Sequence, residues 1–318
     1  MRSFSFIRLA YSTKIQSKLK RRNCISSANL VFSCSMITLK AYAKINLGLH
    51  ILRKRDDGYH DIETVFHRVN IFDEILLSPS SKISLMCNTC DLPFGEENLC
   101  IRAARLLQEK CNISDGVDMQ LKKHIPIGAG LGGGSSDAAS TLAGLNLLWK
   151  LDLTSEQLSH FALVLGSDVP YFLGTSSAYA TGRGEHLEYF PLDIPFWIVI
   201  VYPNLHISTA WAYQHSEIPS RQSGENNMKE TLLESLHNPL QLATTLQNDF
   251  EPLILRTYQQ VAQVKKKLYD LGADFAQMSG SGSSVYGLFV DKKDAEHACD
   301  KLNKTCQTFI TPPHFMAK

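Results

Sequence analysis

The chain has 318 residues, which is enough for about two domains of ordinary size. Apolar types make up 44% of it and charged types 20%, a balance that excludes a disordered, collagen-like or coiled-coil protein. Residues 1–36 carry seven basic and no acidic side chains, which leaves 25 basic and 31 acidic side chains, a net charge of −6, in the rest. Such an acidic body predicts no nucleic-acid partner, and no apolar run reaches the ~18 residues needed to cross a membrane.

Residues 1–35 form a segment that is rich in Ser and Arg and free of acidic residues. This composition is typical of a transit peptide for a mitochondrion or plastid. The alternative is upstream sequence attached to a chain that truly starts at Met36. We expect residues 1–35 to be a disordered extension outside the fold. The protein is then expected to be cytoplasmic, or to reside in a plastid or another organelle if the extension is a transit peptide.

Eight cysteines are scattered along the chain. Cys87 and Cys90 form one CxxC pair, but no second pair of cysteines or histidines follows at the spacing of a zinc site. We therefore expect reduced thiols in an intracellular compartment and no bound metal at these cysteines.

The first predicted element of the fold is a strand over residues 37–51, in which apolar and polar residues alternate. After a turn at Asp57-Gly58, residues 63–77 predict a second strand with a break near Asp73. Residues 98–111 have helical spacing, and residues 117–126 alternate as in an antiparallel strand. The first strand is expected to be half-buried, with one polar face made of Lys40, Tyr42, Lys44, Asn46 and His50.

A glycine-rich loop over residues 128–134 leads into a predicted helix that begins at Ser135, and a second helix is expected over residues 155–165. The apolar run 196–201 predicts a buried strand that starts the second half of the chain. Residues 216–237 are polar and irregular, which indicates a surface excursion.

Downstream, a long helix is expected over residues 249–270, ending at Gly272. Strands over 273–278 and 285–290 should enclose a loop of small residues, 279–284, and a helix should follow over 293–303. Because the predicted strands come in hairpins with helices grouped between them, the fold class is α+β and not a doubly wound sheet.

The glycine-rich loop predicts an anion site. Five glycines in seven positions free the backbone to curl, so that several N–H groups can converge on an oxyanion at the start of a helix. Ser135 and Ser136 can cap that helix or reach phosphate oxygens. The spacing also fits a dinucleotide loop, but the preceding strand alternates and carries Lys122 and Lys123, unlike a buried parallel strand. The ATPase loop GxxxxGK[ST] is excluded because Gly134 occupies the lysine position. A dinucleotide-dependent oxidoreductase stays as an alternative that NADH binding would test.

Three blocks of the sequence together resemble the GHMP kinase superfamily, the group that includes galactokinase, homoserine kinase and mevalonate kinase. They are residues 40–49 (KAYAKINLGL), the loop 126–136 and residues 278–286 (MSGSGSSVY). A finer resemblance, carried by Asp57-Gly58-Tyr59-His60, by Asn98-Leu99 and by residues 165–172, is to those members that phosphorylate a diphosphocytidyl derivative of methylerythritol in non-mevalonate isoprenoid biosynthesis. The similarity covers residues 37–310 approximately.

The resemblance implies a two-domain kinase fold with antiparallel-rich sheets, an ATP-binding domain over residues 36–190 and a C-terminal domain over residues 191–318. It implies ATP as co-substrate together with Mg²⁺, although no metal ligand is visible in the sequence. The implied ATP-binding loop consists of Pro126, Ile127, Gly128, Ala129, Gly130, Leu131, Gly132, Gly133, Gly134, Ser135 and Ser136.

The same resemblance implies the catalytic residues. Asp168 resembles the base that takes the proton of the acceptor hydroxyl, whereas the local sequence alone favours a turn residue before Pro170. Lys44 resembles the lysine that stabilises the alkoxide, and Asn46 shares its face of the strand. The small-residue loop 279–284 either supports the phosphate or acceptor region or is a simple turn between two strands.

The acceptor side is implied by the same finer match. Tyr59 and His60 resemble a pair that binds cytosine, Tyr213 is expected to supply the opposing aromatic ring, and Thr209 a polar contact. The expected function is ATP-dependent phosphorylation of the 2-hydroxyl of the cytidylyl substrate by a monomer or weak homodimer. The alternatives are another GHMP kinase, of homoserine or mevalonate type, and a non-catalytic ligand-binding relative.

Overall fold

The computed structural model describes residues 36–89, 95–217 and 227–317, and residues 35–318 form one compact unit. The predicted extension 1–35, Cys90 and part of the predicted excursion 216–237 lie outside the described residues.

The first sheet is built around two long antiparallel strands, β1 (Ile37–Lys54) and β2 (His60–Ser80). The other strands are β3 (Ile83–Cys87), β4 (Gly116–Lys122), β5 (Ser177–Thr181) and β6 (His186–Phe190), in the order β3-β4-β2-β5-β6, with β1 also paired to β2. Every pair is antiparallel except β3–β4.

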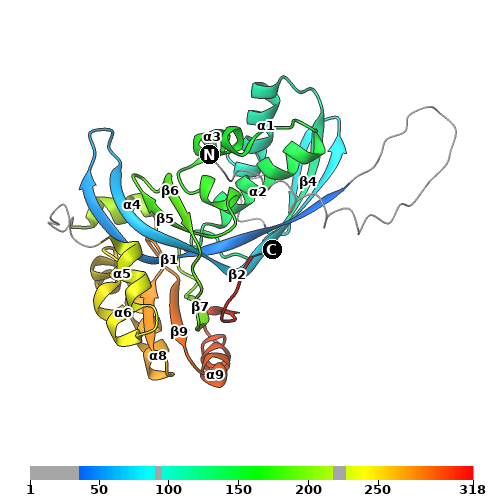
Figure 1. The fold of residues 1–318 in the computed structure, drawn as a ribbon. Coiled ribbons are helices and arrows are strands. Elements are labelled where there is room, and N and C mark those ends of the chain that lie inside the picture. Colours follow the sequence, from blue (N-terminus) through cyan, green and yellow to red (C-terminus); the bar gives the residue numbers. More distant parts are fainter. Residues whose placement is uncertain (1–35, 90–94, 218–226, 318) are drawn as a thin grey trace, which may run out of the picture. The chain divides into compact units, whose positions relative to one another are not determined.

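Three helices cover this sheet and bury its core (Figure 1). They are α1 (Leu99–Cys111), α2 (Gly133–Leu148) and α3 (Ser155–Leu165), and a 3-10 helix over Pro170–Leu173 follows them. Asn98 caps α1 by accepting the N–H of Cys100, and a capping box formed by Thr154 and Gln157 starts α3.

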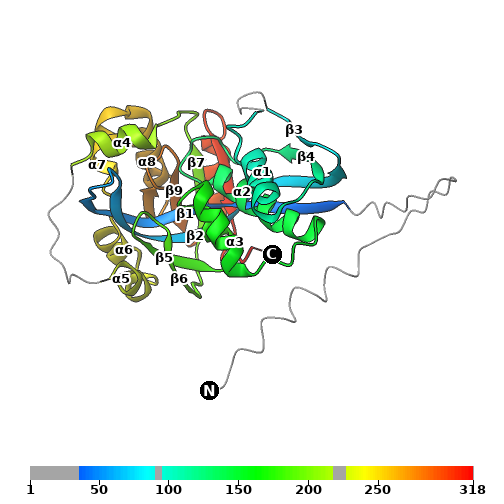
Figure 2. The ribbon, with the colours of Figure 1, turned by 90° about the horizontal axis from the view of Figure 1, so that it is seen from above.

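The second sheet has four antiparallel strands in the order β10-β7-β9-β8. They are β7 (Trp197–Tyr202), β8 (Phe275–Met278), β9 (Val285–Phe289) and β10 (Gln307–Thr311). The helices are α4 (Thr209–His215), α5 (Met228–Ser235), α6 (Pro239–Thr245), α7 (Glu251–Thr257), α8 (Gln259–Asp270) and α9 (Lys292–Leu302). In Figure 2, β1 and β2 run from the group of α4 to α7 at one end to α1 and α2 at the other.

The predicted α+β class with antiparallel-rich sheets is confirmed. The sheets change between β6, which ends at Phe190, and β7, which begins at Trp197. The division of the chain into domains at residue 190 stays a prediction. Of the described helices, none combines the length and the apolar character needed to cross a membrane.

Several predicted boundaries were wrong. β2 has no break at Asp73, β4 ends at Lys122 and not at Pro126, and α2 begins at Gly133. The single helix predicted over 249–270 is two helices separated at Tyr258, whose ring contacts Trp211 of α4 edge-on with ring centroids 5.5 Å apart. The irregular excursion predicted over 216–237 contains α5.

The polar face predicted for the first strand is not open to solvent in its middle, because residues 41–49 are all buried. The backbone N–H of Lys44 donates to the carbonyl of Leu131 at 3.0 Å, and that of Asn46 donates to Ser279 Oγ at 3.2 Å. Two loops from distant parts of the chain therefore bind the edge of β1 that is not paired with β2.

Candidate active site

A cavity of about 1270 Å³ contains the predicted site residues. It is lined by the hairpin of β1 and β2, the glycine-rich loop, the start of α4 and residues 280–282. The residues predicted from the sequence to be catalytic or substrate-binding all line it: Lys44, Asn46, Tyr59, His60, Asp168, Thr209 and Tyr213. Parts of the chain that are more than 160 residues apart thus meet at one site.

The glycine-rich loop owes its shape to three glycines in the left-handed region of backbone space. Gly128, Gly130 and Gly132 have φ angles of +63°, +78° and +70°, which favour glycine because a Cβ is strained there. A Cβ on Gly130 would lie 2.3 Å from the carbonyl oxygen of Ser279, so this position has no room for a side chain. The loop is therefore held in one curled shape against a second loop.

Nine of the eleven predicted loop residues line the cavity; Leu131 and Ser136 do not. The side chain of Leu131 is buried in the core, and the hydroxyl of Ser136 donates to the carbonyl of Tyr42 at 2.7 Å, which ties α2 to β1. Gly132, the N-cap of α2, offers no side-chain cap to the first turn. The N-terminus of α2 is thus available to an anion in the cavity.

The small-residue loop 279–284 supports the glycine-rich loop. The hydroxyl of Ser279 donates to the carbonyl of Gly130 at 2.9 Å, and the N–H of Ser284 donates to the carbonyl of Ala129 at 3.1 Å. Asn248 in turn holds the start of the small-residue loop, because its amide donates to the carbonyls of Met278 and Gly280. Of the two readings of this loop, the geometry favours support of the glycine-rich loop.

Lys44 and Asp168 face each other beside the loop. Lys44 Nζ donates to Asn46 Oδ1 at 2.6 Å and lies 3.6 Å from Asp168 Oδ2. Both residues line the cavity, but the side chain of Lys44 is 6% exposed and that of Asp168 is 35% exposed, so the carboxylate is the more accessible of the two groups. Burial lowers the pKa of Lys44, and the neighbouring Asp168 opposes this shift. In such a pair the carboxylate can accept a proton, and the neighbouring ammonium can stabilise a developing oxyanion.

At the other end of the cavity lie three aromatic side chains. The rings of His60 and Tyr213 stack at 4.7 Å between centroids with 12° between planes, whereas the ring of Tyr59 is 55% exposed. Burial, and then the charge of Lys54, lower the pKa of His60, which keeps the imidazole neutral at neutral pH. Thr209 Oγ1 lies 2.9 Å from Ser281 Oγ, within hydrogen-bond distance. This end presents flat rings and hydrogen-bonding edges to a ligand.

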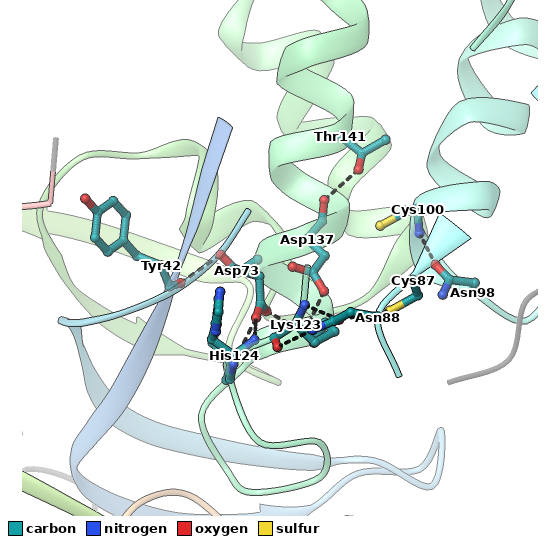
Figure 3. Close-up of polar contacts among 12 residues, drawn as sticks. Tyr42, Asp73, Cys87, Asn88, Asn98, Cys100, Lys123, His124, Asp137 and Thr141 are labelled. Carbon is teal, nitrogen blue, oxygen red and sulfur yellow. Dashed lines mark hydrogen bonds and ion pairs between the residues drawn. The ribbon is translucent and has the colours of Figure 1, made fainter. Parts of the chain in front are cut away.

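A second polar cluster lies behind the glycine-rich loop, and the sequence did not reveal it (Figure 3). Lys123 Nζ donates to Asp73 Oδ2 at 2.5 Å and to Asp137 Oδ2 at 2.7 Å, and all three side chains are at most 6% exposed. Asp73 Oδ1 also accepts the backbone N–H groups of His124 and Ile125. Burial raises the pKa of Asp137 to about 7, although Lys123 pulls it down. The cluster anchors the chain where it enters the loop.

The described residues contain no group of three or more His, Cys, Asp or Glu side chains arranged to hold a metal ion. Oxygen donors beside the loop are nevertheless present. Ser135 and Asp137 both line the cavity, and Asp137 Oδ1 is buried without a hydrogen-bond partner. This donor set fits an ion that takes most of its ligands from phosphates and water, as Mg²⁺ does.

Comparison with known families places this site in a class. Residues 98–182 match the N-terminal domain of the GHMP kinases, and residues 227–308 match their C-terminal domain. The chain belongs to the GHMP kinase family.

Individual relatives carry a more specific name. The chain is 46% identical over 286 residues to the 4-diphosphocytidyl-2-C-methyl-D-erythritol kinase of Prosthecochloris aestuarii, with 88% of this chain and 98% of the relative covered. It is 46% identical over 281 residues to the kinase of the same name from Chlorobium phaeobacteroides, with the same coverage of each chain.

Solved structures agree with this fold. A crystal structure of 4-(cytidine 5'-diphospho)-2C-methyl-D-erythritol kinase matches with a TM-score of 0.73 and 33% identity, covering 86% of this chain and 98% of that one. A homoserine kinase from Cytophaga hutchinsonii matches with a TM-score of 0.69 at 18% identity, covering 92% of this chain and 98% of that one. The second likeness concerns the fold alone.

Proposed function

We propose that this protein transfers the γ-phosphoryl group of ATP to the 2-hydroxyl of 4-diphosphocytidyl-2-C-methyl-D-erythritol, a step of non-mevalonate isoprenoid biosynthesis. The observation that carries the proposal is one cavity that joins the Lys44–Asp168 pair, a glycine-rich loop at a helix N-terminus and an aromatic end. The names and identities of the relatives support the same acceptor.

In the proposed reaction, the loop 126–136 and the N-terminus of α2 hold the phosphates of ATP. The acceptor lies with its cytosine at Tyr59, His60 and Tyr213 and with its hydroxyl at Asp168. The Asp168 carboxylate accepts the hydroxyl proton, and the oxygen attacks the γ-phosphorus as ADP leaves. The Lys44 ammonium stabilises the negative charge that develops on the oxygen. Positioning and charge stabilisation are what phosphoryl transfer mainly requires.

Lys44 is suited to this role because Asn46 orients it. Asn46 Oδ1 accepts from Lys44, while Asn46 Nδ2 donates to Thr64 Oγ1 at 2.9 Å. Thr64 in turn donates to the carbonyl of Gly48 at 2.6 Å, so that the chain of hydrogen bonds ends on the backbone of β1. The ammonium is therefore held in place independently of Asp168.

Mg²⁺ is part of the proposal, with Ser135 and Asp137 as the residues that would hold it beside the phosphates. When bound, the ion would neutralise the phosphate oxygens. The proposal also includes the ATP-binding role of residues 36–190, a monomer or weak homodimer without a nucleic-acid partner, and a cytoplasmic or, with a transit peptide, organellar location.

The alternative GHMP activities differ in the acceptor. Homoserine and mevalonate are small and lack an aromatic base, so they leave the stacked rings of His60 and Tyr213 without a ligand to bind. A non-catalytic relative is disfavoured because Lys44 and Asp168 keep hydrogen-bond and charge geometry suited to proton transfer.

Coupled ADP release tests the proposal. The purified chain is given ATP and Mg²⁺ with the cytidylyl acceptor, with homoserine, with mevalonate or with no acceptor. We expect rapid ADP release with the cytidylyl acceptor alone, and its loss in Asp168→Asn. Faster release with homoserine or mevalonate, or full activity in folded Asp168→Asn, would contradict the proposal.

A further inference from the structure

Of the residues that the structure describes, four with Lys or Arg side chains line the cavity, and they differ in how their charge is used. Lys44 is engaged by Asn46 and Asp168, and Lys123 by Asp73 and Asp137. Lys54 lies at the end of β1, and its charge adds to the larger effect of burial in lowering the pKa of His60. Arg183 is the fourth.

Arg183 is only lightly engaged. Its Nε lies 3.4 Å from Glu185 Oε1, and its side chain is 28% exposed. Glu185 also accepts the backbone N–H of Arg183, which fixes the turn and not the guanidinium. In the part of the chain that the structure describes, the two terminal nitrogens of Arg183 have no hydrogen-bond partner. The guanidinium therefore keeps most of its donors for a ligand.

The position of Arg183 lies between the two ends of the site. It sits in the turn between β5 and β6, and a Cβ on the next residue, Gly184, would lie 3.5 Å from Asp168 Oδ1. The guanidinium carbon lies 4.7 Å from the ring centroid of Tyr59, a cation–π contact that holds the side chain over the aromatic end. One residue thus reaches from the reacting carboxylate toward the ring that is expected to bind the base.

We propose that Arg183 binds the diphosphate of the acceptor and makes the site specific for a nucleoside diphosphate linkage. This inference rests on the proposed function, in which the acceptor's diphosphate connects the base to the reacting alcohol. A diphosphate there approaches the Asp168 carboxylate, and a positive charge is needed to offset the repulsion. The guanidinium offers paired donors that match two phosphate oxygens, which a lysine does not.

The test compares binding of cytidine and of cytidine 5'-diphosphate (CDP) to wild type and to Arg183→Met, by calorimetry without ATP. Methionine keeps an apolar stem against Tyr59 and removes the charge. We expect CDP affinity to fall roughly tenfold to a hundredfold, the range of hydrogen bonds to a charged group, with cytidine affinity within about twofold of wild type. In turnover, the KM of the acceptor should rise while that of ATP stays constant.

Two further variants keep the test decisive. Arg183→Lys retains the positive charge without the paired donors of the guanidinium, and it should recover part of the CDP affinity that Arg183→Met loses. Arg53→Met removes an arginine that pairs with Asp61 on the hairpin outside the cavity, and it should bind both ligands as wild type does. Melting temperatures show that each variant is folded.

Three results would overturn the inference. Equal losses for cytidine and CDP would mean that Arg183 only supports Tyr59, and unchanged binding of both would remove Arg183 from the site. A rise in the KM of ATP alone would place Arg183 in the ATP-binding part of the site. Because CDP and cytidine binding is measured without turnover, failure of the wild type to phosphorylate the acceptor is a separate result, which counts against the proposed function.

Discussion

Two buried lysines flank the same glycine-rich loop and differ in every respect that matters for chemistry. Lys123 donates to two buried carboxylates at 2.5 and 2.7 Å, whereas Lys44 lies 3.6 Å from one carboxylate that is 35% exposed. The carboxylates outweigh burial and raise the pKa of Lys123, whereas burial outweighs Asp168 and lowers the pKa of Lys44.

The difference distinguishes a lysine with a structural role, Lys123, from one with a proposed catalytic role, Lys44. A buried charge whose partners are buried as well is committed to the fold, and its removal leaves opposite charges unpaired. A buried charge with a partner open to solvent can still change its interactions when a ligand arrives. On this basis we propose that Lys44 acts in the reaction and that Lys123, although it also lines the cavity, mainly holds Asp73 and Asp137 in place.

The largest expected effect is on the turnover of variants at Lys44 and Asp168. Asp168→Asn keeps the shape of the side chain but does not accept a proton, and we expect kcat to fall by on the order of 10²–10⁴. Lys44→Met should also lower kcat, and the double variant should be little worse than the poorer single one if the two residues act as a unit. Steady-state kinetics with melting temperatures measure both. Near-wild-type kcat in both folded single variants would contradict the proposed catalytic roles of Lys44 and Asp168.

The next largest effect is on the stability of variants in the cluster of Lys123, Asp73 and Asp137. Lys123→Met leaves Asp73 and Asp137 buried without their cation, and the free energy of unfolding should fall by about 3–5 kcal/mol. Urea unfolding at pH 7.5 measures it. Adding Asp137→Asn to Lys123→Met removes one of the stranded charges and should recover part of the loss. If Lys44→Met destabilises the chain as much as Lys123→Met does, the proposed division into a structural and a catalytic lysine is contradicted.

The pH dependence of stability sharpens the same contrast. Burial raises the pKa of Asp137 to about 7, above the unfolded value of 3.8, so the folded state binds the proton more tightly. This contribution is fully present below pH 3.8 and is lost as the pH rises through 7. We expect Asp137→Asn to flatten the decline in unfolding free energy between about pH 4 and 7, as urea titrations would show. Asp115→Asn, at an exposed position before β4, should leave the slope unchanged.

The smallest effects come from adjacent glycines that face the two lysines. A Cβ on Gly132 would lie 2.8 Å from Phe172 Cζ and 3.2 Å from Lys44 Cε, and one on Gly133 would lie 2.9 Å from Ile125 Cγ2 and 3.2 Å from Lys123 Nζ. Gly132→Ala should therefore lower kcat several-fold and, because φ is +70° there, also lower stability, whereas Gly133→Ala should mainly lower stability, by about 1–3 kcal/mol. Gly95→Ala is the control, because nothing lies within 4 Å of a Cβ there and the residue does not line the cavity. Indistinguishable kinetics and melting temperatures in all three would contradict the assignment.

Local patterns were enough to predict most of the elements. The alternation of β1, the apolar run of β7 and the glycines of the loop each reflect chemistry within a few residues. The helix α5 was missed although its signal was present, since Asn227 caps it and Glu230 follows three residues later.

What the sequence did not predict depends on contacts between distant segments. Asp73 looks like a strand breaker, but its carboxylate accepts the N–H groups of His124 and Ile125, which are about 50 residues away. The break at Tyr258 involves no Gly or Pro. Arg183 lies between Gly182 and Gly184, which indicate a turn but not what the turn contacts, and only the folded chain brings its guanidinium to Tyr59.

The hydrogen bonds between the loops have a consequence for how this chain can be divided. The curled loop that follows β4 keeps its shape partly through Ser279 and Ser284, which come from the connection between β8 and β9. An isolated fragment that ends near residue 190 would carry the loop without these supports. Because one loop lies in each half, exchange of halves between related kinases would set the glycine-rich loop of one parent against the supporting loop of the other, and we expect it to succeed only when the contacts of Ser279 and Ser284 are kept.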